Sequence, residues 1–173
     1  MKLVQKNYIE SHNPHYPVID ELSNKAKNLF NIVNYHITQR FLATQQYIGF
    51  SDLYNLLKQE EAYKDLPTKV SKQIVKRISH TWKKYIKAHK DWTKNPHKYR
   101  NEPKRPHDLN KDEGRYLVIY PLDAISRPAL KEGMIKLSNV DVSIPTQVTE
   151  KVVEVRFIPK KNFYIMEVVY TKE

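Results

Sequence analysis

Residues 66–94 read LPTKVSKQIVKRISHTWKKYIKAHKDWTK, and this stretch predicts one long amphipathic helix. Apolar residues recur every three or four positions, which is the period of one helical face. Thr68 is the expected N-cap, and Asn95 and Pro96 end the pattern because proline disfavours helical geometry in the residue before it. The apolar face comprises Val70, Ile74, Ile78, Trp82, Tyr85 and Trp92. We expect this face, including both tryptophans, to be buried rather than to stack on bases.

The opposite face of the same helix carries a stripe of cations and no Glu. Steps of four and three residues keep these side chains within a narrow band of the helix surface. Adjacent like charges repel each other by about 0.2–0.5 kcal/mol per pair, and the phosphates of a partner would relieve that repulsion. The stripe consists of six lysines, Lys69, Lys76, Lys83, Lys87, Lys90 and Lys94, with Gln73 and His80 between them. A solvated surface is the alternative, but such surfaces normally mix both signs, so we favour a nucleic-acid partner.

The charge of the whole chain favours the same class of partner. Thirty Lys and Arg against 19 Asp and Glu give the 173 residues a net charge of +11. Residues 58–111 alone hold 16 of these cations and 6 of these acids. Such an excess attracts polyanions, of which nucleic acid is the commonest. An acidic membrane surface and a ribosome-type basic protein are the competing interpretations.

The composition also excludes several classes. The chain has no Cys, which rules out disulfides and Cys-based zinc sites. The first residues lack the apolar run of a signal peptide, and no stretch approaches the roughly 18 apolar residues of a membrane span. We therefore expect a cytoplasmic protein without a membrane partner.

Shorter patterns on both sides of the long helix predict an α+β chain. Residues 3–9 alternate as a strand, residues 20–41 have helical spacing with Asp20 as N-cap, and Ser51 is placed to cap a shorter helix. From Arg115 the period becomes two. This change predicts strands at residues 115–120, 135–137, 152–158 and 163–171, the last two joined as a hairpin. We expect residues 3–9 to pair with the C-terminal strands, with the helices between them forming a separate lobe.

Residues that carry chemistry do not converge in the sequence. Metal-dependent nucleases need two or three carboxylates around Mg²⁺, but the acids here are scattered. The one local cluster, Asp108, Asp112 and Glu113, is typical of turns and strand starts. No Gly-rich phosphate loop is present, and nothing supports a Ser–His–acid triad, although the sequence alone leaves one open. His12 and His15 flank a proline that breaks helical geometry, so we predict loop residues rather than metal ligands.

Several motifs, taken in order, are similar to those of a known family. They are AKNLFN at residues 26–31, DLYNLLK at 52–58, LPTKVSKQ at 66–73, YRNEPK at 99–104, RYLVIYP at 115–121 and VRFIPK at 155–160. Their order and spacing resemble the N-terminal half of TnpB (OrfB) proteins of insertion sequences, which are relatives of compact type V CRISPR effectors. The similarity runs almost from end to end of the chain.

The resemblance implies an architecture. Residues 1–14 and 113–173 would form an oligonucleotide-binding-type β-barrel, called the wedge. Residues 15–112 would form an inserted helical recognition lobe that ends in a basic, proline-rich connector. In the family these parts hold a guide RNA and read a short motif beside the double-stranded DNA target.

The resemblance also implies a division of labour. Family members continue into a RuvC-like nuclease domain and a zinc ribbon, whereas this sequence ends at Glu173. We therefore expect no catalytic site and no cofactor in this chain, with Mg²⁺ and Zn²⁺ confined to a separate RuvC-like nuclease polypeptide. A stand-alone, nuclease-free DNA- or RNA-binding regulator and a truncated transposon remnant are the alternatives.

The start of the long helix is the predicted DNA-reading site. A helix N-terminus offers free N–H groups and a positive dipole to a phosphate, and Gln can pair with adenine through two hydrogen bonds. We assign DNA reading to Lys69, Ser71, Lys72, Gln73, Lys76 and Arg77. We assign contacts with the nucleic-acid backbone to Lys83, Lys87, Lys90, Lys94, Arg100, Lys104 and Arg105. The alternative for Gln73 is an ordinary exposed helix residue.

Overall fold

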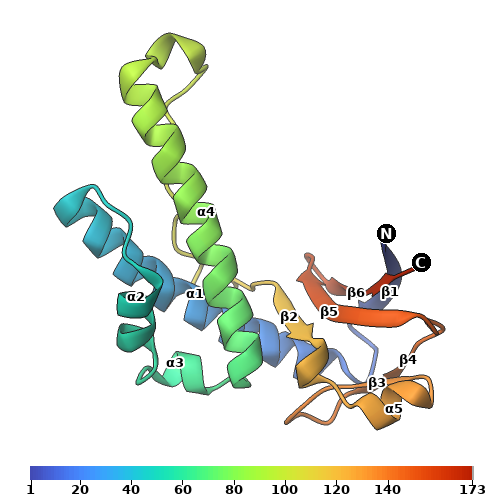
Figure 1. Ribbon diagram of the computed structural model, residues 1–173. Coiled ribbons are helices and arrows are strands. Elements are labelled where there is room, and N and C mark those ends of the chain that lie inside the picture. Colours follow the sequence, from blue (N-terminus) through green and yellow to red (C-terminus); the bar gives the residue numbers. More distant parts are fainter. Residues whose placement is uncertain (173) are drawn as a thin grey trace.

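The long helix is helix α4, Thr68–Lys94, in a computed structural model that describes residues 1–172 (Figure 1). Its end after Lys94 confirms the prediction, since Asn95 leaves helical geometry and a 3₁₀ turn η1, Pro96–Lys98, follows. The N-cap is Pro67 rather than Thr68, because Pro67 already has extended geometry and no side chain caps this end. The distal half of α4 extends beyond the other helices in Figure 1.

Helix α1, Tyr16–Thr44, is longer than predicted and corrects one assignment. Asp20 is not its N-cap but lies inside its second turn. The helix begins earlier because Pro17, in the first turn, has no N–H to leave unsatisfied there. Asn13 stabilises the approach by accepting a hydrogen bond from the backbone N–H of His15, the actual N-cap residue (2.8 Å).

Two short helices connect α1 to α4. Helix α2, Phe50–Leu57, starts after Gly49, so the prediction that Ser51 caps it is wrong. Helix α3, Glu61–Lys64, is a single turn that the sequence pattern did not predict. Leu53 and Leu57 of α2 and Tyr63 of α3 are buried, which packs both helices against the core.

The strands form a four-stranded antiparallel sheet in the order β1-β6-β5-β2. Strand β1, Lys2–Glu10, pairs with β6, Phe163–Thr171, from Lys2 opposite Thr171 to Glu10 opposite Phe163. This register confirms the predicted pairing of the first strand with the C-terminal strands. The other two strands are β5, Lys151–Pro159, and β2, Val118–Pro121.

Between β2 and β5 the chain adds a small unit of its own. It contains the 3₁₀ turn η2, Leu122–Ala124, helix α5, Arg127–Lys131, and a two-stranded ribbon of β3, Met134–Lys136, and β4, Ser143–Pro145. Helix α5 and β4 were not predicted, because segments this short carry little periodicity. The α+β prediction is confirmed, and residues 1–172 contain no closed barrel.

Helices and sheet share one continuous hydrophobic core. Trp82 of α4 is fully buried, as predicted, and meets Phe41 of α1 at a ring-centroid distance of 5.8 Å. Trp92 is only half-buried and lies against His89 (6.1 Å between ring centroids), so its assignment to the core is wrong. The reason is the projection of α4: Trp92 is on the apolar side of the helix, but few residues of the body reach that far. No helix within residues 1–172 is long and apolar enough to cross a membrane.

Candidate nucleic-acid interface

The cationic face of α4, meaning its stripe residues together with Arg77 and Lys84, points away from the core. The exposed members are Lys69, Lys76, Arg77, His80, Lys83, Lys84, Lys87, Lys90 and Lys94, while Lys72 and Gln73 are half-buried. Arg77 lies close enough to the Tyr116 hydroxyl to counteract the rise that burial imposes on the pKa of that group. The structure thus brings most of the predicted α4 residues onto one accessible surface.

Ser71 does not belong to this surface. It is fully buried, and its hydroxyl donates a hydrogen bond to the Tyr63 carbonyl (2.7 Å), which ties α3 to α4. Its position among the DNA-reading residues is therefore corrected to a packing position. The sequence held the signal, because the helical wheel that aligns Lys69 with Gln73 puts Ser71 on the opposite side.

The charges of this face are not neutralised within the protein. Within residues 1–172, no lysine or arginine of α4 forms an ion pair with a carboxylate. The single acid of α4, Asp91, accepts hydrogen bonds from the Tyr99 hydroxyl (2.7 Å) and the Asn95 amide (3.1 Å), which hold the pKa of this carboxyl below its usual range. Lys83 lies 5.2 Å from the centre of the Tyr47 ring.

The connector, which is the segment between α4 and β2, is held along α1 by a polar seam that the sequence pattern did not predict. The seam consists of residues that share one side of α1, namely Asp20, Ser23, Asn24, Lys27, Asn31 and Asn34. Asn31 exchanges two hydrogen bonds with the backbone of Leu109 (3.0 and 2.9 Å), and Ser23 exchanges two with Tyr116 (2.7 and 3.2 Å). Lys27, though buried, donates to the Lys111 carbonyl. The segment therefore has a defined path without helix or strand.

Asn34 is the central residue of this seam. It is buried, and its amide nitrogen donates to the Pro106 carbonyl (3.3 Å) and to Asp108 Oδ1 (2.8 Å). Its amide oxygen accepts the indole N–H of Trp82 (2.8 Å). One side chain of α1 therefore connects the connector with α4.

The cations of the connector differ in exposure and do not share one surface. Arg100 and Lys104 are exposed, whereas Arg105 is half-buried. Arg105 lines a cavity of about 360 Å³ with Tyr35, Thr38, Gln39, His107 and Asp108. It lies near Tyr85, on the side of α4 opposite the lysine stripe. The structure thus does not place Arg105 on the cationic face of α4.

A charged cluster links the helices to the sheet at the other end of the seam. Arg115 donates to both oxygens of Asp20 (2.9 and 3.3 Å), and the Tyr164 hydroxyl of β6 donates to Asp20 Oδ1 (2.6 Å). Burial alone would raise the pKa of Asp20, but the hydrogen bonds from Arg115 and Tyr164 outweigh it, so the pKa lies below its usual range. Burial and the bond to Asp20 raise the pKa of Tyr164.

This cluster predicts a specific acid sensitivity. Because the folded-state pKa of Asp20 is lowered, the carboxylate stabilises the fold fully above its unfolded pKa of about 3.9, and this contribution is lost as pH falls through the folded pKa. The difference in unfolding free energy between wild type and Asp20→Asn should therefore shrink on acidification. Urea unfolding of both proteins at a series of pH values measures it. A difference that stays constant down to acid pH would contradict the assignment.

Within residues 1–172, no group of three His, Asp or Glu side chains is arranged to hold a metal ion. His12 and His15 lie in the turn between β1 and α1, as predicted, and His12 Nδ1 is 3.8 Å from Glu10 Oε2. No protein-family model matches the chain, and no curated protein matches it either. The similarity to TnpB proteins stays a prediction from the motifs.

Proposed function

We propose that this protein binds nucleic acid through the cationic face of α4. The observation that carries the proposal is a row of unpaired, exposed cations along a 27-residue helix. At about 1.5 Å per residue this helix is roughly 40 Å long, so the row can follow a phosphate backbone over several nucleotides. Release of counterions from that backbone would supply the binding free energy.

We further propose the more particular role implied by the TnpB resemblance. In this role the chain is the recognition half of an RNA-guided DNA endonuclease, binds a guide RNA and the target-adjacent motif of duplex DNA, and acts with a RuvC-like nuclease polypeptide. The pairing of β1 with β6 supports it, because it makes the helices an insertion into a β unit. It is part of this proposal that the separate nuclease polypeptide, and not this chain, cuts the DNA.

Contacts at both edges of the sheet support a wedge of oligonucleotide-binding type. Beyond the β2 edge, Ile125 forms a bridge with Leu137, which follows β3. Near the β1 edge, the Thr146 hydroxyl, just after β4, donates to Gln5 Oε1 (2.7 Å). The residues that flank the β3–β4 ribbon thus reach toward both edges of the sheet, which is where the closing strands of such a barrel would lie.

The experiment that tests nucleic-acid binding is a salt titration of the affinity. For about five phosphate contacts with duplex DNA, the slope of log K against log salt is expected to be roughly −4 to −5. Fluorescence anisotropy with duplex DNA and with a structured RNA measures it. A slope near zero for both would mean that the cationic face is only a solvated surface.

A pair of variants separates recognition of the base sequence from contacts with the phosphate backbone. Gln73 lies half-buried in the second turn of α4. If its side chain makes two hydrogen bonds to a base, Gln73→Ala should weaken binding to the preferred DNA motif by roughly 1–3 kcal/mol. Lys87→Ala should weaken all sequences alike and flatten the salt slope by about one unit. Binding of a randomised duplex library measures both effects. Equal, sequence-independent losses would contradict the division.

A further inference from the structure

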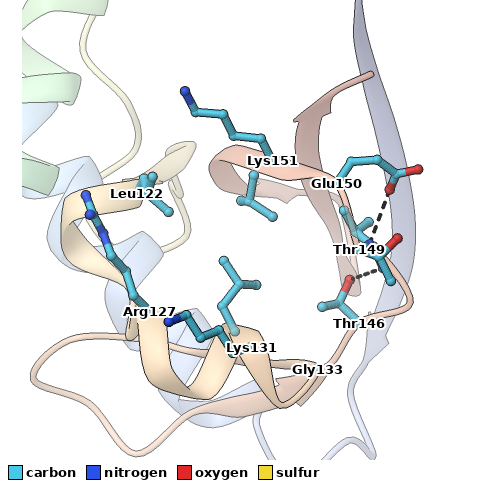
Figure 2. Close-up of a pocket in the computed structure, with 11 residues that line it drawn as sticks. Leu122, Arg127, Lys131, Gly133, Thr146, Thr149, Glu150 and Lys151 are labelled. Carbon is cyan, nitrogen blue, oxygen red and sulfur yellow. Dashed lines mark hydrogen bonds between the residues drawn. The ribbon is translucent and has the colours of Figure 1, made fainter. Parts of the chain in front are cut away.

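A cavity of about 400 Å³ lies between helix α5 and the start of β5 (Figure 2). Its volume falls within the range of small-ligand sites, about 300–1,000 Å³. Leu122 and Leu130 form one side of its lining, and Val148 and Val152, both buried, belong to the other. A ligand in this cavity would therefore meet a largely apolar wall.

Three cations stand at the opening of this cavity. Arg127 and Lys131 come from α5, and Lys151 is the first residue of β5. Figure 2 shows their charged ends spread around the left half of the view, with Lys151 above, Arg127 at the far left and Lys131 below, whereas the Glu150 carboxylate lies on the right, where it accepts the Thr149 N–H (3.2 Å). One side of the opening is thus positive.

These cations remain available to a ligand. Within residues 1–172, Lys131 and Lys151 form no ion pair. Arg127 contacts Asp123 (3.3 Å), but both side chains are more than half exposed (66% and 60%), so water screens the pair and it contributes little. Each of these side chains could donate a charge-assisted hydrogen bond to an anion at the opening.

We propose that this cavity binds a nucleoside phosphate. The phosphate lies among Arg127, Lys131 and Lys151, and the sugar and base lie against the apolar wall. The choice of this ligand among anions with an apolar body rests on the proposed nucleic-acid function. Two sources supply the same chemistry: the 5′-terminal nucleotide of a bound strand and a free nucleotide.

The test compares matched ligands and matched variants of the full chain. Isothermal titration calorimetry with AMP and with adenosine should give binding of AMP that is at least about tenfold tighter, since only AMP brings the charged phosphate. Arg127→Ala combined with Lys131→Ala should abolish that advantage. Lys160→Ala combined with Lys161→Ala, in the exposed β5–β6 turn, removes the same charge and should leave it intact. Unchanged far-UV circular dichroism and melting temperature exclude misfolding of either variant.

The two sources are separated with short single-stranded RNAs that carry either a 5′-phosphate or a 5′-hydroxyl. A preference for the 5′-phosphate that is lost in the Arg127/Lys131 variant supports strand-end binding. AMP binding without such a preference supports a free nucleotide, and it supports the inference even if the chain fails to bind longer nucleic acids.

Two results overturn the inference. The first is equal affinity for AMP and adenosine, together with equal affinity for the 5′-phosphate and 5′-hydroxyl RNAs, while salt-dependent binding through α4 persists. This result would reject the cavity as a nucleotide site and leave the proposed function of the protein intact. The second is displacement of AMP by decanoate, a fatty-acid anion, at a lower concentration than AMP itself needs to bind, which would assign the cavity to acyl chains.

Discussion

Replacing Lys83, Lys87, Lys90 and Lys94 together by Gln is expected to weaken duplex DNA binding by about a thousandfold at about 0.1 M salt. Each lost phosphate contact removes about 0.9 from the magnitude of the log–log salt slope, so four contacts should flatten it by about 3.6. All four side chains are exposed on α4 and none is paired with an acid, so the fold should lose no ion pair and only the contact of Lys83 with the Tyr47 ring. Removing their mutual repulsion should leave the stability of the variant equal or slightly higher.

The control for this variant removes the same charge elsewhere. Lys2, Lys58, Lys136 and Lys161 are exposed and lie outside α4, and their joint replacement by Gln gives the same net charge. If net charge alone attracted DNA, both variants would lose affinity equally. The location of the cationic face predicts a loss of less than about tenfold for the control, because long-range attraction is screened over about 10 Å at 0.1 M salt. Equal losses in the two variants would reject α4 as the contact surface.

The features predicted correctly are those in which local pattern and tertiary environment agree. The end of α4 follows from Asn95 and Pro96, which act within a few residues of the chain. Strand β6 occupies residues 163–171 as predicted, because its alternation matches a sheet with one face on the core. Burial of Trp82 follows from its position on the apolar face of a helix that crosses the body.

The features missed depend on contacts between distant parts of the chain. Asn31 and Asn34 are polar residues of a largely apolar helix, and their partners come from the return of residues 106–116 along α1 and, for Asn34, also from Trp82 of α4. Asp20 has the composition of an N-cap, but its partners Arg115 and Tyr164 lie 95 and 144 residues away in sequence. Polar residues within an otherwise apolar helical face were the available signal, since a buried amide or carboxylate needs a partner.

The residues of the candidate interface likewise divide into those that could be predicted from the sequence and those that could not. Its lysines could be predicted because an exposed helical face is a local property of α4. The position of Arg105 could not, because the path of the connector depends on the seam with α1 and not on its own sequence. The cavity beside α5 also escaped prediction, since Arg127 and Lys151 are distant in sequence and line one cavity only in the folded chain.

Asn34 is the residue whose loss should cost the fold most for its size. Asn34→Ala removes two donors and one acceptor at a buried position and leaves the indole N–H of Trp82 buried without a partner. A buried unsatisfied group costs about 1–3 kcal/mol, so we expect a loss of about 2–4 kcal/mol in unfolding free energy. Asn28→Ala changes an exposed residue of the same helix and should alter stability by no more than about 0.5 kcal/mol. Urea unfolding measures both.

A double-mutant cycle with Trp82→Phe shows whether the Asn34–Trp82 hydrogen bond is the cause. Phe removes the N–H but keeps an aromatic ring, and because it orphans Asn34 Oδ1 it should cost about 1–3 kcal/mol alone. The two changes together should cost about 1–2 kcal/mol less than the sum, since each breaks the same bond. Strict additivity would assign the loss to cavity formation instead.

Release of the connector provides a second readout. Limited trypsin digestion should cut after Lys104 and Lys111 in Asn34→Ala and Asn34→Ala/Trp82→Phe, but only slowly in Asn28→Ala. With the connector free, Arg105 would lose its fixed position beside α4 while the lysine face stayed intact, so duplex DNA affinity per folded molecule should fall far less than in the four-lysine variant.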